Sequence, residues 1–303
     1  MELTMKLAAL ARMTVVAGSV AGIGFAAAEP IAAQAAPAAV RPGLDPQVEA
    51  ARAKYEFAGW AKGARRVGLP LAELELAGLR GRDVVFHAGG VSRRFDDAAG
   101  TGRVLVELLV AEDAAGAHEE VLRQIAFVQS TKTLPSAASR GIAAGDVGWI
   151  GYGGRDGSKI AWLAFASGNL ALRVKSFDPD AAGAVDIAPI VAHVSELAAR
   201  QPTVADGVAL PRPQIARFAP AAESVVAGSP LALDLVAKDL DGRAAAVDFI
   251  VGGARQGQGY VEQDEQGTWQ FHATGAGALD LTVEARSRFG TFTRQTVRVT
   301  VTR

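Results

Sequence analysis

Apolar residues recur at every second position in several runs of the chain, most regularly in its last quarter. The runs Leu231–Ala237, Leu279–Ala285 and Val297–Val301 all show this period of two. Because successive side chains of a strand point to opposite faces of a sheet, the pattern predicts strands with one buried and one exposed face. Turn residues follow two of these runs, at Asp239–Gly242 and near Phe289-Gly290. The last quarter is therefore predicted to be all β.

Residues 213–303 contain enough short strands for a complete two-sheet module. Additional strand candidates are Gln214–Phe218, Ser224–Val226, Val247–Val251, Gly259–Gln263 and Thr268–Ala273. About seven short strands separated by turn residues are typical of an immunoglobulin-like β-sandwich. We therefore expect 213–303 to form such a sandwich.

Residues 70–201 mix the period of two with the helical period. The strand candidates are Leu74–Leu76, Val84–Phe95, Val104–Val110, Val147–Tyr152, Ile160–Ala166 and Leu170–Val174. The Gly89-Gly90 pair inside the second candidate is expected to mark a bulge or bend. One helix is expected after Asp113, which is placed to cap it, and another over about Val185–Arg200.

This order of elements predicts an α+β domain over 70–201. The residues Ser167-Gly168-Asn169 are suited to a tight hairpin turn, and strands joined by hairpins imply a mainly antiparallel sheet. The two helices are expected to cover one face of that sheet, which gives a two-layer arrangement.

The amino terminus has the order of a secretory signal peptide. Basic residues precede a small-residue apolar run, Met13–Ala28, and small-x-small cleavage candidates follow, the first after Ala28 and a later one after position 35. Residues 1–28 are thus predicted to be a signal peptide. No later stretch approaches the length of a membrane-spanning helix, so no membrane insertion is expected after its removal.

Two further segments are predicted to connect these parts. Residues 29–69 are expected to be a leader with a short helix over Pro46–Ala61, where Pro46 suits the first helical position. The proline-rich residues 202–212 are expected to be a stiff linker between the α+β domain and the sandwich.

The charge balance and the absence of cysteine exclude several classes of function. The 303 residues carry 31 basic and 32 acidic side chains, which gives a formal net charge of -1. A nucleic-acid-binding protein needs a basic domain or stripe, and the sequence has no long run of like charges, so no nucleic-acid partner is expected. Without cysteine, disulfides, thiolate metal sites and nucleophilic thiols are absent.

Several strings in the last quarter resemble known surface repeats. The strings VAGSPLALDLVAKDLDG at Val226–Gly242 and GTWQF at Gly267–Phe271, followed by ALDLTVEARSRFG and QTVRVTV, resemble the bacterial cadherin-like and immunoglobulin-like surface repeats. The resemblance implies a β-sandwich that serves as a spacer or interaction module. The order of elements in 70–201 loosely resembles the PsbP/Mog1-type α+β folds of exported proteins.

In some of those relatives a D-x-D-G turn helps to bind calcium, and the matching residues here are Asp239, Asp241 and Gly242. Calcium takes six to eight oxygen ligands, and the sequence offers two carboxylates at this turn. Where relatives often carry another acidic residue, this chain has Arg286 and Arg288, which would repel a cation. A structural turn is the favoured interpretation, because Asp and Gly also suit turns. Asp239 and Asp241 stay as calcium candidates, and no other cofactor is expected.

No sequence motif indicates catalysis. There is no nucleophile elbow, phosphate loop or paired-histidine metal motif. His118, beside two glutamates, is expected on an exposed helix face. Trp149, Tyr152 and Trp162 fall on adjacent predicted strands, where they line a ligand groove or, as the favoured alternative, pack in the core.

These features predict an exported, non-catalytic binding or adaptor protein, periplasmic, secreted or on the cell surface. Its partner would be an envelope or extracellular protein or glycan. One alternative is an exported enzyme of unrecognised family, with its site on the Thr131–Gly145 loop or around Trp149 and Tyr152. Another is a calcium-stabilised structural module.

Overall fold

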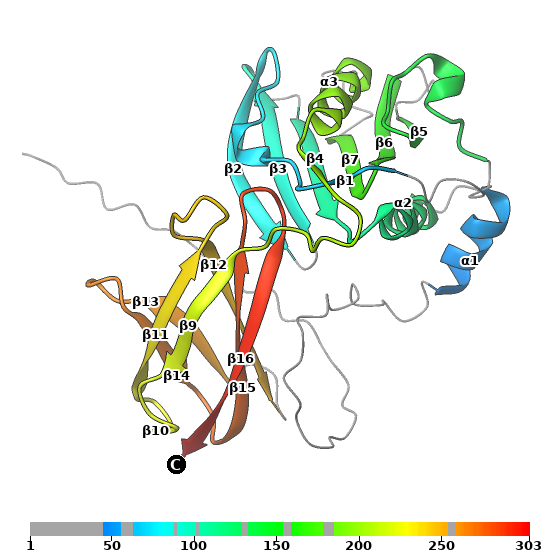
Figure 1. The fold of residues 1–303 in the computed structure, drawn as a ribbon. Helices are drawn as coiled ribbons and strands as arrows, with labels where there is room; N and C mark the ends of the chain where they lie inside the picture. Colours follow the sequence, from blue (N-terminus) through cyan, green and yellow to red (C-terminus); the bar gives the residue numbers. More distant parts are fainter. Residues whose placement is uncertain are drawn as a thin grey trace, which may run out of the picture.

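The computed structural model describes residues 45–55, 63–87, 90–100, 103–128, 133–153, 159–177, 185–253 and 258–303. The predicted signal peptide lies outside these ranges. Within them the fold consists of mostly antiparallel β-sheets and three α-helices (Figure 1). None of these helices is long and apolar enough to cross a membrane.

The first half of the described chain is built on one six-stranded sheet. Its order is β2-β3-β4-β7-β6-β5, and every neighbouring pair is antiparallel. The strands are β2 (Leu79–His87), β3 (Gly90–Asp97), β4 (Arg103–Val110), β5 (Val147–Gly153), β6 (Lys159–Ser167) and β7 (Leu170–Phe177). The predicted antiparallel sheet is confirmed, and β4 to β7 fall where the alternation placed them.

Helices cover both faces of this sheet. The helices are α1 (Asp45–Lys54), α2 (Ala114–Val128) and α3 (Ala188–Ala199), with the 3-10 turns η1 (Leu71–Glu73) and η2 (Ala138–Arg140). Helices α1 and α2 share a core with Ala164, Ala166 and Ala171 of the sheet. Helix α3 and η1 share a separate core with Leu163 and Phe165. Alternate residues of β6 therefore belong to opposite cores, and the prediction of two layers with both helices on one face is wrong.

The burial pattern of β6 explains why the sheet has helices on both faces and the domain therefore has three layers. Every residue from Leu163 to Ser167 is buried. A continuous apolar run is typical of a strand that is covered on both faces, whereas a strand with one wet face alternates. The run Ile160–Ala166 is of the first kind, so the sequence held a signal for helices on both sides.

Two predicted strands differ from the structure. The segment around Leu74–Leu76 is not a strand: η1 leads into an isolated bridge between Leu76 and Leu79. The candidate Val84–Phe95 is two strands, because β2 and β3 pair with each other from the His87–Gly90 end. Gly90 is the first residue of β3 and pairs with His87, so the chain changes strand at this point, whereas Gly89 lies outside the described residues. The bulge of this hairpin lies further along β2, between Gly81 and Val84.

Two local predictions are confirmed by specific bonds. The Asp113 Oδ1 accepts the N–H of Gly116 at 2.8 Å, as expected of a residue that caps α2. Strands β6 and β7 are joined through Gly168, at φ +58°, and Asn169. The buried Asn169 accepts the N–H of Arg66 at 2.6 Å and donates to the carbonyl of Ala111 at 2.9 Å. This turn fastens β1 (Arg65–Arg66), which pairs with β8 (Thr203–Val204), to the sheet.

The last part of the chain forms two four-stranded sheets around one core. The orders are β13-β14-β11-β9 and β10-β16-β15-β12, and the β10–β16 pair is parallel. The strands are β9 (Gln214–Pro220), β10 (Ser224–Val226), β11 (Pro230–Lys238), β12 (Ala246–Gly253), β13 (Gly259–Gln263), β14 (Trp269–Ala273), β15 (Gly277–Arg286) and β16 (Phe292–Thr302). Leu231 and Leu233 of one sheet meet Leu281 and Val299 of the other in this core. The predicted β-sandwich architecture is confirmed.

The tip of the β15–β16 hairpin docks on the six-stranded sheet (Figure 1). The carbonyl of Phe289 accepts the N–H of Leu69 at 3.2 Å. Gly290 approaches Val91, Leu108 and Val110 so closely that an added Cβ would lie 3.2–3.3 Å from their side chains. Arg288 Nη1 pairs with Glu73 at 2.9 Å.

The connection between sheet and sandwich is also held in place. Arg212 forms an ion pair with Glu112 and donates to the carbonyl of Phe292 at 3.0 Å. Leu210 is buried, and Thr203–Val204 pairs as a strand. The segment 202–212 is thus packed against both parts.

Candidate functional site

One part of the six-stranded sheet is rich in exposed arginine. It lies on the face that carries α2, which packs mainly over β6 and β7 and leaves β2 and β3 open. Two adjoining pockets occur here and share Arg80 and Arg82 as lining residues. We call this region the cationic face and define it by Arg80, Arg82, Arg94, Arg103, Lys175 and the carboxylate of Asp96.

Strand register places these side chains in two rows that cross the sheet. From β2 to β7 the first row is Arg80, Asp96, Arg103 and Phe177. From β3 to β6 the second row is Arg94, Leu105, Lys175 and Trp162. Residues two apart on a strand share a face, so the two rows lie side by side on one surface. Within each row, cationic side chains are two strands apart.

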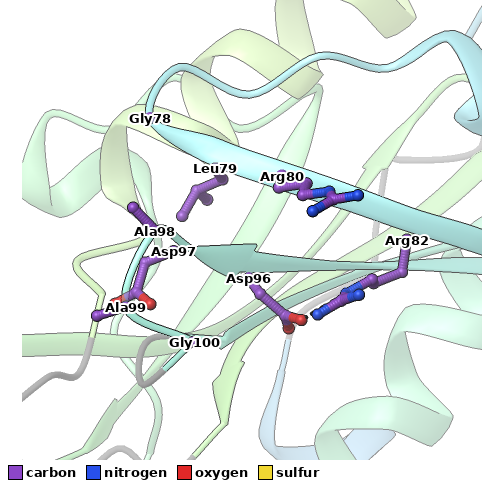
Figure 2. A pocket seen from close by; sticks show the side chains of 9 residues that line it. All are labelled: Gly78, Leu79, Arg80, Arg82, Asp96, Asp97, Ala98, Ala99 and Gly100. Atoms are coloured by element: carbon purple, nitrogen blue, oxygen red, sulfur yellow. Dashed lines mark hydrogen bonds and ion pairs between the residues drawn. The ribbon is translucent and has the colours of Figure 1, made fainter.

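Asp96 organises the arginines of this face. Its Oδ2 accepts a hydrogen bond from Arg82 Nε at 2.6 Å (Figure 2). Arg94 Nε lies 3.2 Å from its Oδ1. The bond from Arg82, with the charges of Arg94 and Arg103, holds the pKa of Asp96 below its usual range. The residue is buried, whereas Arg82 and Arg94 are about half exposed. One carboxylate therefore positions two guanidinium groups and neutralises one charge.

Lys175 is the half-buried member of the face. Burial lowers its pKa, the charge of Arg173 lowers it further, and Glu107 acts in the opposite direction. Arg173 forms an ion pair with Glu107 on the row beyond, so its charge is balanced locally. The Lys175 Nζ lies 5.0 Å from the ring centroid of Phe177, a cation–π distance.

The rim of the face also carries carboxylates. Asp83, in the β2 bulge, lines one pocket, and Asp97 lines the other. Counting these two with Asp96, five cationic side chains face three carboxylates, which leaves an excess of two positive charges. The surface can therefore hold an anion and offers several guanidinium groups to do so.

The structure separates the three aromatic residues predicted as groove candidates. Trp149 is buried and packs edge-to-face on Tyr55, with ring centroids 5.6 Å apart. It belongs to the core under α1 and α2. Trp162 is partly buried and ends the second row of the cationic face beside Lys175. Tyr152 lies on β5, and its side chain is outside the described part of the structure.

The two calcium candidates lie at the corner that leads from β11 to β12. The Asp239 carboxylate accepts the N–H of Leu240 at 2.6 Å and, across the sandwich, the N–H of Arg288 at 3.1 Å. The Asp241 Oδ1 accepts the N–H of Arg243 at 3.1 Å. Among the described residues, no three His, Cys, Asp or Glu side chains gather as a metal-binding group. The Asp239 carboxylate braces the docked hairpin tip.

His118 differs from the expectation of an exposed helix position. It is 4% exposed on the inner side of α2. Burial lowers its pKa, and the charges of Asp146 and Asp113 oppose that effect. The helical period explains the difference, because His118 lies three residues before Val121 and four before Leu122, on the same apolar side.

The cationic face was not predicted from the sequence, although a signal was present. Two of the four contributing strands carry cations at alternate positions, Arg80 and Arg82 on β2 and Arg173 and Lys175 on β7. A search for runs of like charge finds only cationic residues that are close together in the sequence. Here the charge gathers across neighbouring strands, and only the pairing register brings it together.

Comparison with known proteins finds partial similarity among solved structures only. No family model and no curated protein matches the chain. Among solved structures, the chain is similar in part to domains 4 and 5 of the S-layer protein SbsC, with 17% identity and a TM-score of 0.22. The match covers 30% of this chain and 54% of that chain, about half of its length. At that TM-score the similarity does not identify a shared fold.

Proposed function

We propose that this chain is an exported, non-catalytic binding or adaptor protein whose cationic face contacts an anionic partner in the cell envelope or outside the cell. In this proposal 70–201 is an α+β domain that meets the partner, and 213–303 is an immunoglobulin-like sandwich that acts as a spacer. The observation that carries the proposal is the clustering of five cationic side chains on an open sheet face of a chain whose net charge is -1.

Electrostatics supports this role for the face. Neighbouring strands lie about 4.8 Å apart, so cations two strands apart within a row are roughly 9–10 Å from each other, close to the Debye length of about 8 Å at physiological salt. Their fields therefore add at the surface of a bound polyanion. Arginine also offers a planar fork of donors that matches a carboxylate or sulfate group.

The strand order of the sandwich supports the second part of the proposal. In immunoglobulin-like folds one sheet has the order A-B-E-D and the other contains C, F and G. The order β9-β11-β14-β13 corresponds to the first, and β12, β15 and β16 to the second. The docked hairpin tip would hold the binding face at a fixed orientation to this spacer.

Retention on immobilised dextran sulfate tests the proposal. The double variant Arg94→Gln/Arg103→Gln should elute at a clearly lower salt concentration than the unmodified protein, because two arginines that contact sulfate groups of the polymer are lost. Arg298→Gln, an exposed arginine of β16, is the matched control and should elute as the unmodified protein does. Equal elution of all three proteins would contradict the proposal, as would a catalytic activity abolished by one substitution in 70–201.

Export is tested separately. Residues 1–35 fused to a reporter that is active only after export should give signal in the periplasm or medium, and the unfused reporter should not. Mass determination of the exported product would locate the cleavage at position 28 or 35. Retention of the fusion inside the cell would contradict this part of the proposal.

A further inference from the structure

The cationic face combines positive charge with apolar surface, so its partner should carry both anionic groups and apolar groups. We propose that it binds a linear, carboxylate-bearing polysaccharide that lies across the strands. This inference rests on the proposed function and specifies its partner.

The order of side chains along the rows provides the first support. In the second row a cation alternates with an apolar side chain: Arg94, Leu105, Lys175, Trp162. The first row has cations at its first and third positions and ends on Phe177. With strands about 4.8 Å apart, like groups within a row recur at roughly 9–10 Å. In a polymer of acidic sugars each acidic residue carries one carboxylate and one apolar ring face, so the chain offers both kinds of group to such a row.

The chemistry of the individual side chains fits the same partner. Four of the five cations are arginines, whose donor fork binds a carboxylate through two parallel hydrogen bonds. Phe177 and Leu105 are partly exposed next to these cations. An aromatic or branched apolar surface packs well against the C–H groups of a sugar ring. A partner with charge alone would leave this apolar surface unused.

The edge of the sheet argues against an extended acidic peptide as the partner. Strand β2 is the edge strand, and a peptide that joined the sheet would have to pair along it. The bulge between Gly81 and Val84 interrupts the regular ladder of β2, and the exposed Arg82 and Asp83 lie within it. Bulges and charges of this kind prevent strand addition. The open face, and not the edge, is thus the surface available to a partner.

Titration calorimetry of the full chain with four polymers tests the inference. The probes are polygalacturonate, neutral dextran, dextran sulfate and poly-L-glutamate, used at matched length and at physiological salt. Polygalacturonate should bind tightest and dextran should not bind. Arg94→Gln/Arg103→Gln should weaken polygalacturonate binding by at least about tenfold, since two groups that donate charged hydrogen bonds are removed. Arg298→Gln should leave the affinity unchanged.

Phe177→Leu separates sugar recognition from charge. It should weaken polygalacturonate binding about threefold, the scale of one lost aromatic contact, and leave poly-L-glutamate binding unchanged. If this variant does not fold, the exposed arginine pair still tests the face. Equal affinity for polygalacturonate and either poly-L-glutamate or dextran sulfate would overturn the inference while the proposed function stands. Failure of every polyanion to bind would overturn both.

Discussion

Asp96 positions two arginines of the cationic face, so its removal should change the affinity for a polyanion in the direction opposite to the one that net charge alone predicts. Asp96→Asn makes the face more positive, so net charge alone would strengthen the binding of a polyanion. We expect weaker binding, because Arg82 and Arg94 lose the carboxylate that positions them. Asp83→Asn, which removes a rim carboxylate from the adjoining pocket, should strengthen binding. Polygalacturonate affinities of the two variants, measured side by side, check this, and stronger binding by Asp96→Asn would refute the positioning role.

His118 makes stability depend on pH in a direction that follows from its burial. Its folded pKa lies below the ordinary value, so the unfolded chain binds the proton more readily. The titration of His118 therefore does not affect stability well above a pH of about 6.5, the ordinary pKa of histidine. Stability falls as the pH drops through that value toward the folded pKa. His118→Gln, which stays neutral, should lose less Tm between pH 7 and pH 5 than the unmodified protein. Thermal melts of both proteins at pH 7 and pH 5 measure this difference. An identical drop in Tm in the two proteins would exclude His118 as the cause.

At the scale of the elements, the sequence predicted most strands and helices but not how they are layered. Alternation located β4, β7 and the sandwich strands, because each has a buried and a wetter face. It did not assign α2 and α3 to opposite faces, since that depends on which residues of β6 point to which helix. The cationic face was missed for a related reason: a site shared by four strands exists only once their register is known.

The Asp239 corner links two elements that are far apart in the sequence. Asp239→Ala removes its bonds to the N–H groups of Leu240 and Arg288 and should cost about 1–2 kcal/mol of the free energy of unfolding. Asp241→Ala, which loses one bond within the turn, should cost less. Because the Asp239 oxygens are engaged by the backbone, added calcium or chelator should leave the Tm unchanged. Urea denaturation and melts with and without calcium measure both effects, and a Tm that rises with calcium would restore the calcium site.

The hairpin tip between β15 and β16 depends on Gly290. Its φ is +93°, and a Cβ there would press on Val91, Leu108 and Val110. Gly267, at φ +82° with nothing within 4 Å, is a matched control for the backbone effect alone. Gly267→Ala should cost about 1–2 kcal/mol, and Gly290→Ala should cost about 1–3 kcal/mol more through overpacking. Equal losses in urea denaturation would show that the tip does not pack on the sheet.

At the scale of the whole molecule, the sandwich combines a core of its own with a docked contact to the sheet. Its buried cluster, which includes Phe271 and Leu281, has no member from the six-stranded sheet. Residues 213–303 expressed alone should therefore fold and melt cooperatively, as judged by circular dichroism. The excised sandwich no longer has the sheet under its hairpin tip, so Gly290→Ala should retain only the backbone cost there and match Gly267→Ala. An excess cost of Gly290→Ala that appears in the full chain and vanishes in the excised sandwich would assign that energy to the docked contact, whereas the same excess in both would place it inside the sandwich.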